Sequence, residues 1–228
     1  MRPYWDDGGC PFCGAQTQES RICDGCEAAL SLACLTEEGN LPRLRRLSEE
    51  DASDTELVCR SLYAYEYDVV KRLLFYLKRY PDKRVVTHFA ERLCGILPET
   101  WKTEGTLYVS IPRSSQGLRK YGFDQGKLLA KTLVRLLGEG NDRRVRYADV
   151  LARRPFGRVQ KKLTAVERMK NQRGRFYVRA LRLPWEPERI VITDDVITTG
   201  ASVLSAAKAL RECFPKAEIF ALSLAAVV

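Results

Sequence analysis

The stretch from residue 189 to residue 225 constrains the fold more than any other part of this 228-residue chain. Residues 189–193 form an apolar, β-branched run that predicts a buried strand, and residues 217–225 form a second apolar run. Residues 201–214, between them, have the pattern of a helix. A crossover of this length is how two parallel strands are connected. We therefore expect an α/β fold, in which a mostly parallel sheet is flanked by helices.

The rest of the chain continues this alternation of strands and helices. The remaining predicted strands are residues 61–65, 106–111 and 147–151, and the remaining predicted helices are residues 68–79, 85–97 and 123–137. His88, the only histidine, lies in the second of these helices and is expected to be a surface or packing residue. No Ser–His or Cys–His nucleophile can be assembled without a second histidine, which excludes those classes of hydrolase.

Composition places the chain among globular proteins, because 45% of its residues are hydrophobic and 29% are charged. No apolar run approaches the roughly 18 residues that a membrane span needs, and residues 1–7 lack the apolar core of a secretory signal. The sequence therefore predicts a cytoplasmic protein without membrane insertion. Eight cysteines in that compartment indicate metal binding or reduced thiols rather than disulfides.

Charge is distributed unevenly along the chain. Residues 1–57 hold five basic and twelve acidic residues, whereas residues 58–228 hold 33 basic and 17 acidic residues. The excess is greatest in residues 143–182, where fourteen Lys and Arg residues accompany two acidic ones. Such a segment favours an anionic partner, which could be nucleic acid, a phosphorylated metabolite or an acidic protein. The alternative is a solvated basic face without a partner.

Four of the cysteines are arranged as two Cys-x-x-Cys pairs near the N-terminus, and they are Cys10, Cys13, Cys23 and Cys26. Each pair can form a knuckle that directs two thiolates to one side, and two knuckles supply the tetrahedral, soft ligand set that Zn²⁺ prefers. Four thiolates leave no open position, so the predicted zinc is structural. A redox pair or buried free thiols are the alternatives.

These observations divide the chain into three parts. Residues 1–35 are predicted to form a zinc-binding module, residues 36–57 an acidic connector, and residues 58–228 the α/β domain. The cysteines outside the predicted metal site fall into two groups. Cys34 is spare, and the thiols predicted to lie in the core are those of Cys59, Cys94 and Cys213.

The loop after the predicted strand 189–193 carries the clearest chemistry. Two adjacent carboxylates, Asp194 and Asp195, come directly after the apolar run and suit the hydroxyls of a diol. A turn and the start of a helix follow, and they offer hydroxyl and backbone N–H groups at Thr198, Thr199, Gly200, Ala201 and Ser202. Such a helix start favours a phosphate group. The sequence thus predicts a sugar-phosphate site, with a capped turn that binds no ligand as the alternative.

The run from Ile190 to Ser202 resembles the phosphoribosyl pyrophosphate (PRPP) motif of type I phosphoribosyltransferases. The resemblance implies that Asp194 and Asp195 are the catalytic acids and contact the ribose hydroxyls. It also implies that residues 198–202 bind the 5′-phosphate and that the α/β domain has the phosphoribosyltransferase-like fold.

Further segments resemble the ComF family, a group of competence-associated, phosphoribosyltransferase-like proteins with an N-terminal zinc module. The segments that carry this resemblance are the two Cys-x-x-Cys pairs, Leu73–Lys78 with Asp82, Val109–Arg113 with Arg119, Gly122–Gln125, and Gln160 and Leu163 with Arg168, Asn171, Gly174 and Phe176. The chain departs from the family pattern where Asp124 replaces an Asn, Tyr121 a basic residue and Pro81 a Gly. Membership would imply a role in natural transformation or in nucleotide-related metabolism.

Two functions follow from the resemblance and stay open at this point. As a phosphoribosyltransferase, the protein would bind PRPP with Mg²⁺, contact the pyrophosphate through Arg113 and Arg119, and close residues 153–175 over the site as a lid. As a non-catalytic module, it would bind single-stranded DNA or other competence proteins and use the pocket to sense PRPP, another ribose 5-phosphate ligand or a DNA end. The residues that would serve as the lid or the nucleic-acid surface are Arg153, Arg154, Lys161, Lys162 and Arg168.

Overall fold

The computed structural model describes residues 9–17, 22–35, 57–138, 145–154, 175–179, 183 and 185–227. In chain order its elements are α1 (Asp24–Leu32), β1 (Val58–Ala64), α2 (Asp68–Leu77), α3 (Lys83–Ile96), the 3-10 turn η3 (Glu99–Lys102), β2 (Thr106–Ser110), α4 (Ser115–Tyr121), α5 (Gln125–Gly138), β3 (Arg146–Tyr147), β4 (Leu151–Arg153), β5 (Phe176–Val178), β6 (Arg189–Ile197), α7 (Ala201–Cys213) and β7 (Glu218–Ala226).

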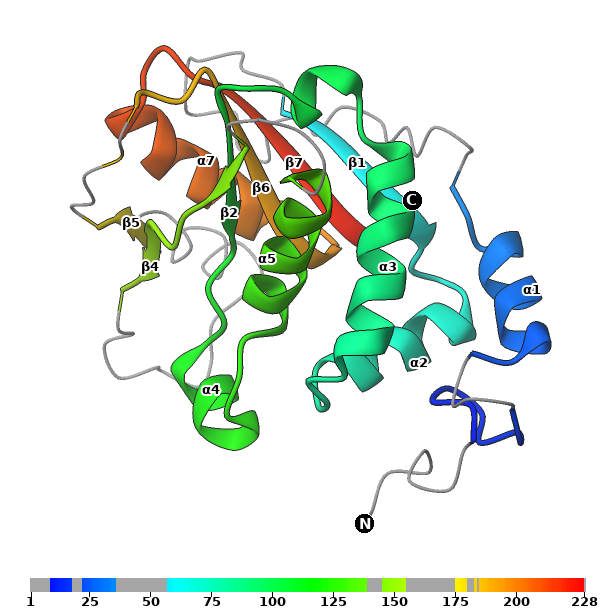
Figure 1. Cartoon of the computed structure of the whole chain (residues 1–228). Coiled ribbons are helices and arrows are strands. Elements are labelled where there is room, and N and C mark those ends of the chain that lie inside the picture. The colour runs from blue at the N-terminus through cyan, green and yellow to red at the C-terminus, as the bar shows by residue number, and fades with distance from the viewer. Residues whose placement is uncertain are drawn as a thin grey trace.

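The central sheet has five strands in the order β1-β7-β6-β2-β3, and every neighbouring pair in it is parallel (Figure 1). Strands β4 and β5 form a separate antiparallel pair. Helices flank the sheet on both faces, with α7 on one side and α3 and α5 on the other (Figure 1). The predicted class, a mostly parallel sheet flanked by helices, is therefore confirmed.

Successive residues of the central strands point to opposite faces and so build two apolar layers. Tyr108 of β2 and Val191 of β6 pack into the layer that α2, α3 and α5 cover. Their neighbours Leu107 and Ile190 pack into the layer beneath α7. Because both faces are covered, these strands read as continuous apolar runs in the sequence rather than as alternating ones.

The strand order predicts a crevice between β2 and β6. The chain leaves β2 through α5 toward β3, at one edge of the sheet, and it leaves β6 through α7 toward β7, in the opposite direction. Connections that diverge from two adjacent parallel strands leave a space outside the carboxyl ends of those strands, where open α/β sheets bind their ligands. The loops after β2 and β6 border this space.

Several sequence predictions differ from the structure. The predicted strand 147–151 is wrong, because β3 ends at Tyr147 and the chain then leaves the sheet so that Leu151–Arg153 pairs with β5. Strand β6 runs on to Ile197, four residues beyond its predicted end, because β7 continues to pair with it. Helices α1 and α4 were not predicted. Cys59 is buried and Cys94 half-buried, but Cys213 is exposed at the end of α7 rather than in the core.

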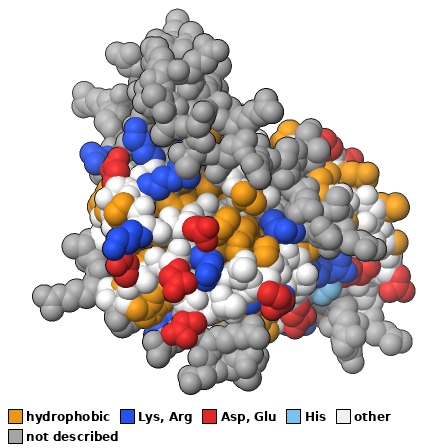
Figure 2. All heavy atoms as spheres, turned by 90° about the horizontal axis from the view of Figure 1, so that it is seen from above, with side chains coloured by type: hydrophobic (Ala, Val, Ile, Leu, Met, Phe, Trp, Pro, Cys, Tyr) orange, Lys and Arg blue, Asp and Glu red, His pale blue; other side chains and the backbone are white. Residues whose placement is uncertain are grey.

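The charges on the described part of the surface are mixed where Figure 2 shows them. Lys and Arg side chains lie among Asp and Glu side chains on the face seen from above, with apolar side chains between them. The described part of this face therefore forms no continuous patch of one sign. None of the described helices combines the length and the apolar character that crossing a bilayer requires.

The turn between α2 and α3 is fixed by one carboxylate. Asp82 caps α3, since its Oδ1 accepts hydrogen bonds from the N–H groups of Arg84 at 2.9 Å and Val85 at 3.4 Å. Its other oxygen accepts the hydroxyl of Tyr76 in α2 at 2.9 Å. One side chain thus joins the end of α2 to the start of α3.

Replacing this carboxylate tests its role in the fold. We expect Asp82→Ala to lower the free energy of unfolding by about 1–2 kcal/mol, because α3 loses its cap and Tyr76 loses an acceptor. Urea unfolding followed by circular dichroism measures the change. The control is Asp68→Ala, whose side chain is 88% exposed and whose effect we expect to stay within about 0.5 kcal/mol. Equal effects of the two substitutions would contradict the capping role.

Candidate functional site

The register of the sheet places the two acidic residues beyond the end of β2. Strand β2 pairs with β6 only as far as Ser110 and Thr193, after which the N–H of Ile111 donates to the carbonyl of Thr193 at 2.9 Å. Strand β7 pairs with β6 through Ile197. Asp194 and Asp195 therefore lie in an ordered strand that has a neighbour on one edge only, and the open edge borders the crevice.

Asp195 is largely shielded from solvent, with a side chain that is 9% exposed. Its Oδ2 lies 3.1 Å from Nζ of Lys78, at the end of α2, and it accepts a hydrogen bond from Nε2 of Gln125 in α5 at 3.2 Å. Two elements distant in sequence thus converge on one oxygen. Sequence reasoning named neither partner as a site residue, although both stand in segments that carry the family resemblance.

Asp194 has a different environment from its neighbour. Its Oδ1 accepts the backbone N–H of Asp195 at 2.8 Å. Burial, and after it the adjacent charge of Asp195, raises the pKa of Asp194 well above its usual value. Two neighbouring carboxylates with such unequal surroundings are typical of a functional site rather than of a structural turn.

The turn after β6 is shaped for an anion. Gly200 adopts a φ of 72°, in the left-handed region that favours glycine, and it precedes α7 as its N-cap residue. No side chain caps this helix. Thr198 and Thr199 are exposed, and Ala201 and Ser202 are partly exposed. The predicted phosphate loop therefore presents hydroxyls and helix N–H groups at the crevice.

Arg113 braces the loop that follows β2. Its guanidinium donates to the carbonyl of Phe123 at 3.1 Å and to the carbonyl of Lys78 at 2.8 Å, and its backbone N–H donates to Asp124 at 2.8 Å. Gly117 of α4 packs against this side chain so closely that an added Cβ would lie 2.7 Å from Nε. Arg113 thus joins the loop after β2 to the end of α2 and to the segment that follows α4.

The remaining basic residues of the predicted site have varied placements. Arg119 is exposed on α4. Arg153 donates from Nε and Nη2 to the carbonyl of Pro112, at 3.2 and 3.0 Å. Burial lowers the pKa of Arg153 to about 10, although the charge of Asp194 acts in the opposite direction. Arg154 is exposed. The other residues of this group lie outside the described residues, and they are Lys161, Lys162 and Arg168.

The four cysteines of the two pairs converge as predicted. The sulfur atoms of Cys10, Cys13, Cys23 and Cys26 all lie within 4.8 Å of one another. A tetrahedral site with metal–sulfur bonds of about 2.3 Å has its sulfurs about 3.8 Å apart, so the arrangement fits a four-coordinate metal ion. The chain therefore has a four-cysteine cluster near its N-terminus, formed by the predicted ligands and compact enough to hold a metal ion.

The cysteines of this cluster differ in how easily they ionise. Burial acts to raise the pKa of Cys10, but the backbone N–H groups of Cys23, Phe12 and Cys13 outweigh it and lower the pKa to about 7. Burial, followed by the neighbouring thiols, raises the pKa of Cys26. Ionising all four thiols at once is thus unfavourable without a cation beside them, and a bound metal ion would supply that charge.

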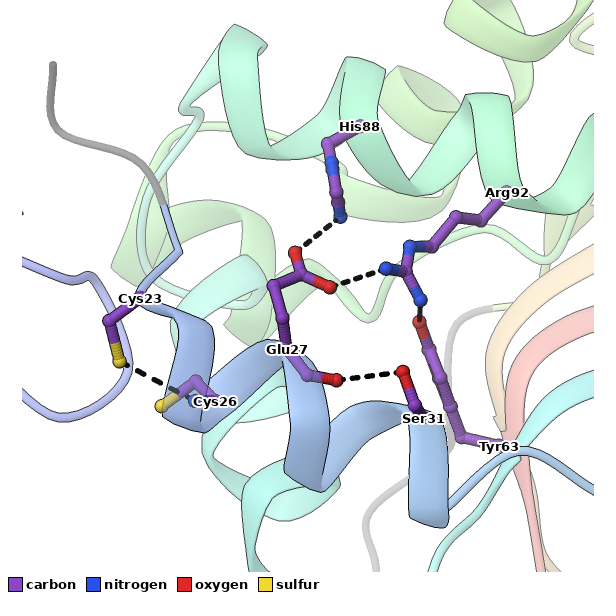
Figure 3. A network of polar contacts seen from close by, with 7 residues as sticks. All are labelled: Cys23, Cys26, Glu27, Ser31, Tyr63, His88 and Arg92. Atoms are coloured by element: carbon purple, nitrogen blue, oxygen red, sulfur yellow. Dashed lines mark hydrogen bonds and ion pairs between the residues drawn. The ribbon is translucent and has the colours of Figure 1, made fainter. Parts of the chain in front are cut away.

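The cluster is joined to the core through α1. Cys23 is the N-cap of this helix, and its sulfur accepts the N–H of Cys26 at 3.4 Å. One turn further on, Glu27 lies between His88 and Arg92 of α3 (Figure 3), with Nε2 of His88 at 3.0 Å from the carboxylate. Burial lowers the pKa of His88 even though Glu27 acts to raise it. His88 thus contacts Glu27 and the ring of Phe89, at 5.0 Å between ring centroids, which agrees with the expected surface or packing role.

Comparisons with known proteins add little to this description. A scan against models of protein families finds no match, and neither does a search of curated proteins. Among solved structures, the chain is similar to adenine phosphoribosyltransferase from Saccharomyces cerevisiae, crystallised with D-2,5-dideoxy-2,5-imino-altritol 1,6-bisphosphate and adenine. The identity is 17%, the coverage is 89% of this chain and 90% of that chain, and the TM-score is 0.34. A TM-score this low carries no weight for fold or function, and the strand pairing alone establishes the parallel sheet.

Removing one ligand tests the metal cluster. We expect the purified protein to hold about one metal ion per chain and Cys23→Ser to lose it, together with the cap of α1. Elemental analysis measures the metal, and circular dichroism measures the helix. The matched control is Cys34→Ser, since Cys34 is exposed and lies outside the cluster. Full metal content in the Cys23 variant would refute the assignment of this ligand.

The raised pKa of Asp194 makes a prediction about stability and pH. A carboxyl whose pKa is higher in the folded than in the unfolded state lowers stability once pH rises above its unfolded value, because ionisation is harder in the folded protein. We expect Asp194→Asn to stabilise the protein near pH 7 and to lose this advantage as the pH falls toward about 4. Urea unfolding at both pH values measures this. Asp68→Asn, at an exposed position, should show no such trend, and a trend shared by both variants would contradict the assignment.

Proposed function

We propose that this protein binds PRPP, or another ribose 5-phosphate ligand, in the crevice between β2 and β6 and acts as a phosphoribosyltransferase. The observation that carries the proposal is the single run of β6, the turn and α7. It presents two carboxylates where β6 has lost one neighbouring strand, and then, after Thr198 and Thr199, a helix start at Gly200 that no side chain caps. The carboxylates suit vicinal hydroxyls, and the helix start suits the 5′-phosphate. The resemblance of the same residues to the PRPP motif supports this ligand.

The proposed reaction needs no protein nucleophile. The bond between C1 of the ribose and the pyrophosphate oxygen breaks, and pyrophosphate leaves with the bonding electrons. A lone pair of the acceptor then forms the new bond to C1, and the proton of the acceptor passes to water. In this scheme Asp194 and Asp195 hold the ribose hydroxyls, and residues 198–202 hold the phosphate. Fixing the sugar in this way is the contribution of the chain to the rate.

Magnesium fits the residues of this site. Mg²⁺ is usually held by one or two carboxylates together with substrate phosphates, and the open edge of β6 offers two carboxylates. When bound with PRPP, it would neutralise the charge of the leaving pyrophosphate. For the cysteine cluster we propose zinc, because four thiolates form the donor set that Zn²⁺ prefers in structural sites.

Membership of the ComF family, with a role in natural transformation and with competence proteins as partners, is part of the same proposal. It is supported by the combination of the cysteine cluster and the acidic strand end in one chain. Most of the basic segment that would bind single-stranded DNA lies outside the described residues. For the described start of this segment, the hydrogen bonds from Arg153 to the carbonyl of Pro112, in the loop after β2, support the lid role over the nucleic-acid role.

Calorimetry on the wild-type protein and two variants tests the ligand. We expect PRPP to bind with Mg²⁺ present and Asp195→Asn to weaken binding roughly 10- to 150-fold, because a hydrogen bond to a charged group contributes about 1.5–3 kcal/mol. Thr199→Val should also weaken binding, since a methyl group replaces a phosphate donor of the same shape.

The matched control is Thr132→Val, because the hydroxyl of Thr132 bonds to the carbonyl of Leu128 within α5. This variant should bind PRPP like the wild type. Absence of binding to the wild-type protein at about millimolar PRPP, which corresponds to roughly 4 kcal/mol of binding free energy, would refute the proposed function.

A further inference from the structure

The ion pair between Lys78 and Asp195 is unusual in its exposure. The carboxylate is 9% exposed, whereas the lysine side chain is 42% exposed, although their charged atoms lie 3.1 Å apart. The side chain of Lys78 is therefore partly in solvent, whereas the carboxylate of Asp195 is part of the protein surface that borders the crevice. A ligand bound beside Asp195 would therefore also lie near the ammonium of Lys78.

The backbone of Lys78 is fixed on two sides. Its N–H donates to the carbonyl of Leu74 as α2 ends, and its own carbonyl accepts Nη2 of Arg113 at 2.8 Å. The same guanidinium braces the loop after β2. The Cα of Lys78 is thus held in register with that loop, and the four-carbon stem leaves the ammonium free to turn between neighbouring anions.

The local charges favour an exchange of partners. Asp194 and Asp195 are adjacent in β6, and the charge of Lys78 acts to lower the pKa of Asp194, against the larger effect of burial. The side chain of Lys78 is already 42% exposed, so its ammonium can leave Asp195 for another anion without a large movement, provided that a ligand then satisfies Asp195. Asp195 can accept a ligand hydroxyl at full strength only when the ammonium has another anion to neutralise.

We propose that Lys78 is a specificity-determining residue that selects ribose ligands carrying a diphosphate over those carrying only the 5′-phosphate. In the free protein its ammonium pairs with Asp195. In the complex it pairs with the diphosphate, and Asp195 turns to the ribose hydroxyl. The inference rests on the proposed function, because it concerns the same crevice. It adds Lys78 as the residue that contacts the diphosphate of the ligand.

A structural role alone makes a different prediction. If Lys78 only neutralised Asp195, its loss would weaken all ribose 5-phosphate ligands alike, because each would meet the same disturbed carboxylate. If Lys78 contacts the diphosphate, its loss weakens PRPP and spares ribose 5-phosphate. The ratio of the two affinities therefore separates the roles, and a general loss of folded protein cancels in that ratio.

The experiment is calorimetry of the full chain with PRPP and with ribose 5-phosphate, each with Mg²⁺, on the wild type, Lys78→Met, Lys78→Arg and Lys71→Met. We expect Lys78→Met to weaken PRPP roughly 10- to 100-fold, the loss of one hydrogen bond between charged groups, and to change ribose 5-phosphate by less than about threefold. Lys78→Arg should retain most of the preference for PRPP, which shows that charge at this position is what counts. Lys71→Met is the control, since Lys71 lies on the same helix and pairs with exposed Asp68.

The outcomes separate the two proposals. Equal weakening of both ligands by Lys78→Met, or unchanged affinity for both, overturns the role of Lys78 and leaves PRPP binding in place. Failure of the wild-type protein to bind PRPP overturns both. Should Lys78→Met fold poorly, the ratio of affinities in Lys78→Gln decides in the same way.

Discussion

Strand β6 is paired along its whole length with β7 but with β2 only as far as Thr193, and the candidate site depends on this difference. Pairing with β7 keeps Asp194 and Asp195 in extended backbone. The end of β2 at Ser110 leaves their other edge open. Had both neighbours ended together, the carboxylates would lie in a loop and lose their fixed positions. Had both continued, hydrogen bonding between strands would close the crevice.

Holding charged side chains close together at this open edge of β6 lowers the stability of the folded protein, and the burial of apolar side chains around the sheet offsets that loss. Two adjacent acidic side chains are held at a place where one of them ionises with difficulty, and two basic side chains from remote elements, Lys78 and Arg153, face them. This group of charges does not by itself stabilise the fold, because removing charged groups from water costs free energy. The buried residues of β2, β6 and the covering helices supply the stability that permits it. Charged groups held close together in this way are expected where a protein binds charged ligands.

Local signals in the sequence were enough for the central elements and for the acidic residues. Apolar, β-branched runs predict buried strands, and the turn at Gly200 predicts the start of α7. The same signals could not find the end of β6, because its last four residues are held by β7, which follows in the chain. Nor could they find Lys78 or Gln125, whose roles exist only once α2 and α5 have packed against the sheet. Arg113 was predicted to contact pyrophosphate. Its hydrogen bonds to two backbone carbonyls give it a bracing role as well, which no pattern in the sequence indicates.

The contacts of the cysteine cluster with the core also bear on how the chain folds as it is synthesised. Phe12 and Leu30 belong to the same buried layer as Phe89, and the ring of Phe12 lies 6.1 Å from that of Phe89. At the usual pace of translation, the ribosome takes roughly 3 to 12 s to add the residues between Leu30 and Phe89. Some partners emerge earlier, since the ring of Phe12 also lies 5.8 Å from that of Tyr76, but the layer that covers the N-terminal segment is incomplete until α3 has been made. A metal ion held by the four thiolates can order the segment locally over this interval, so that it is preformed when α3 emerges.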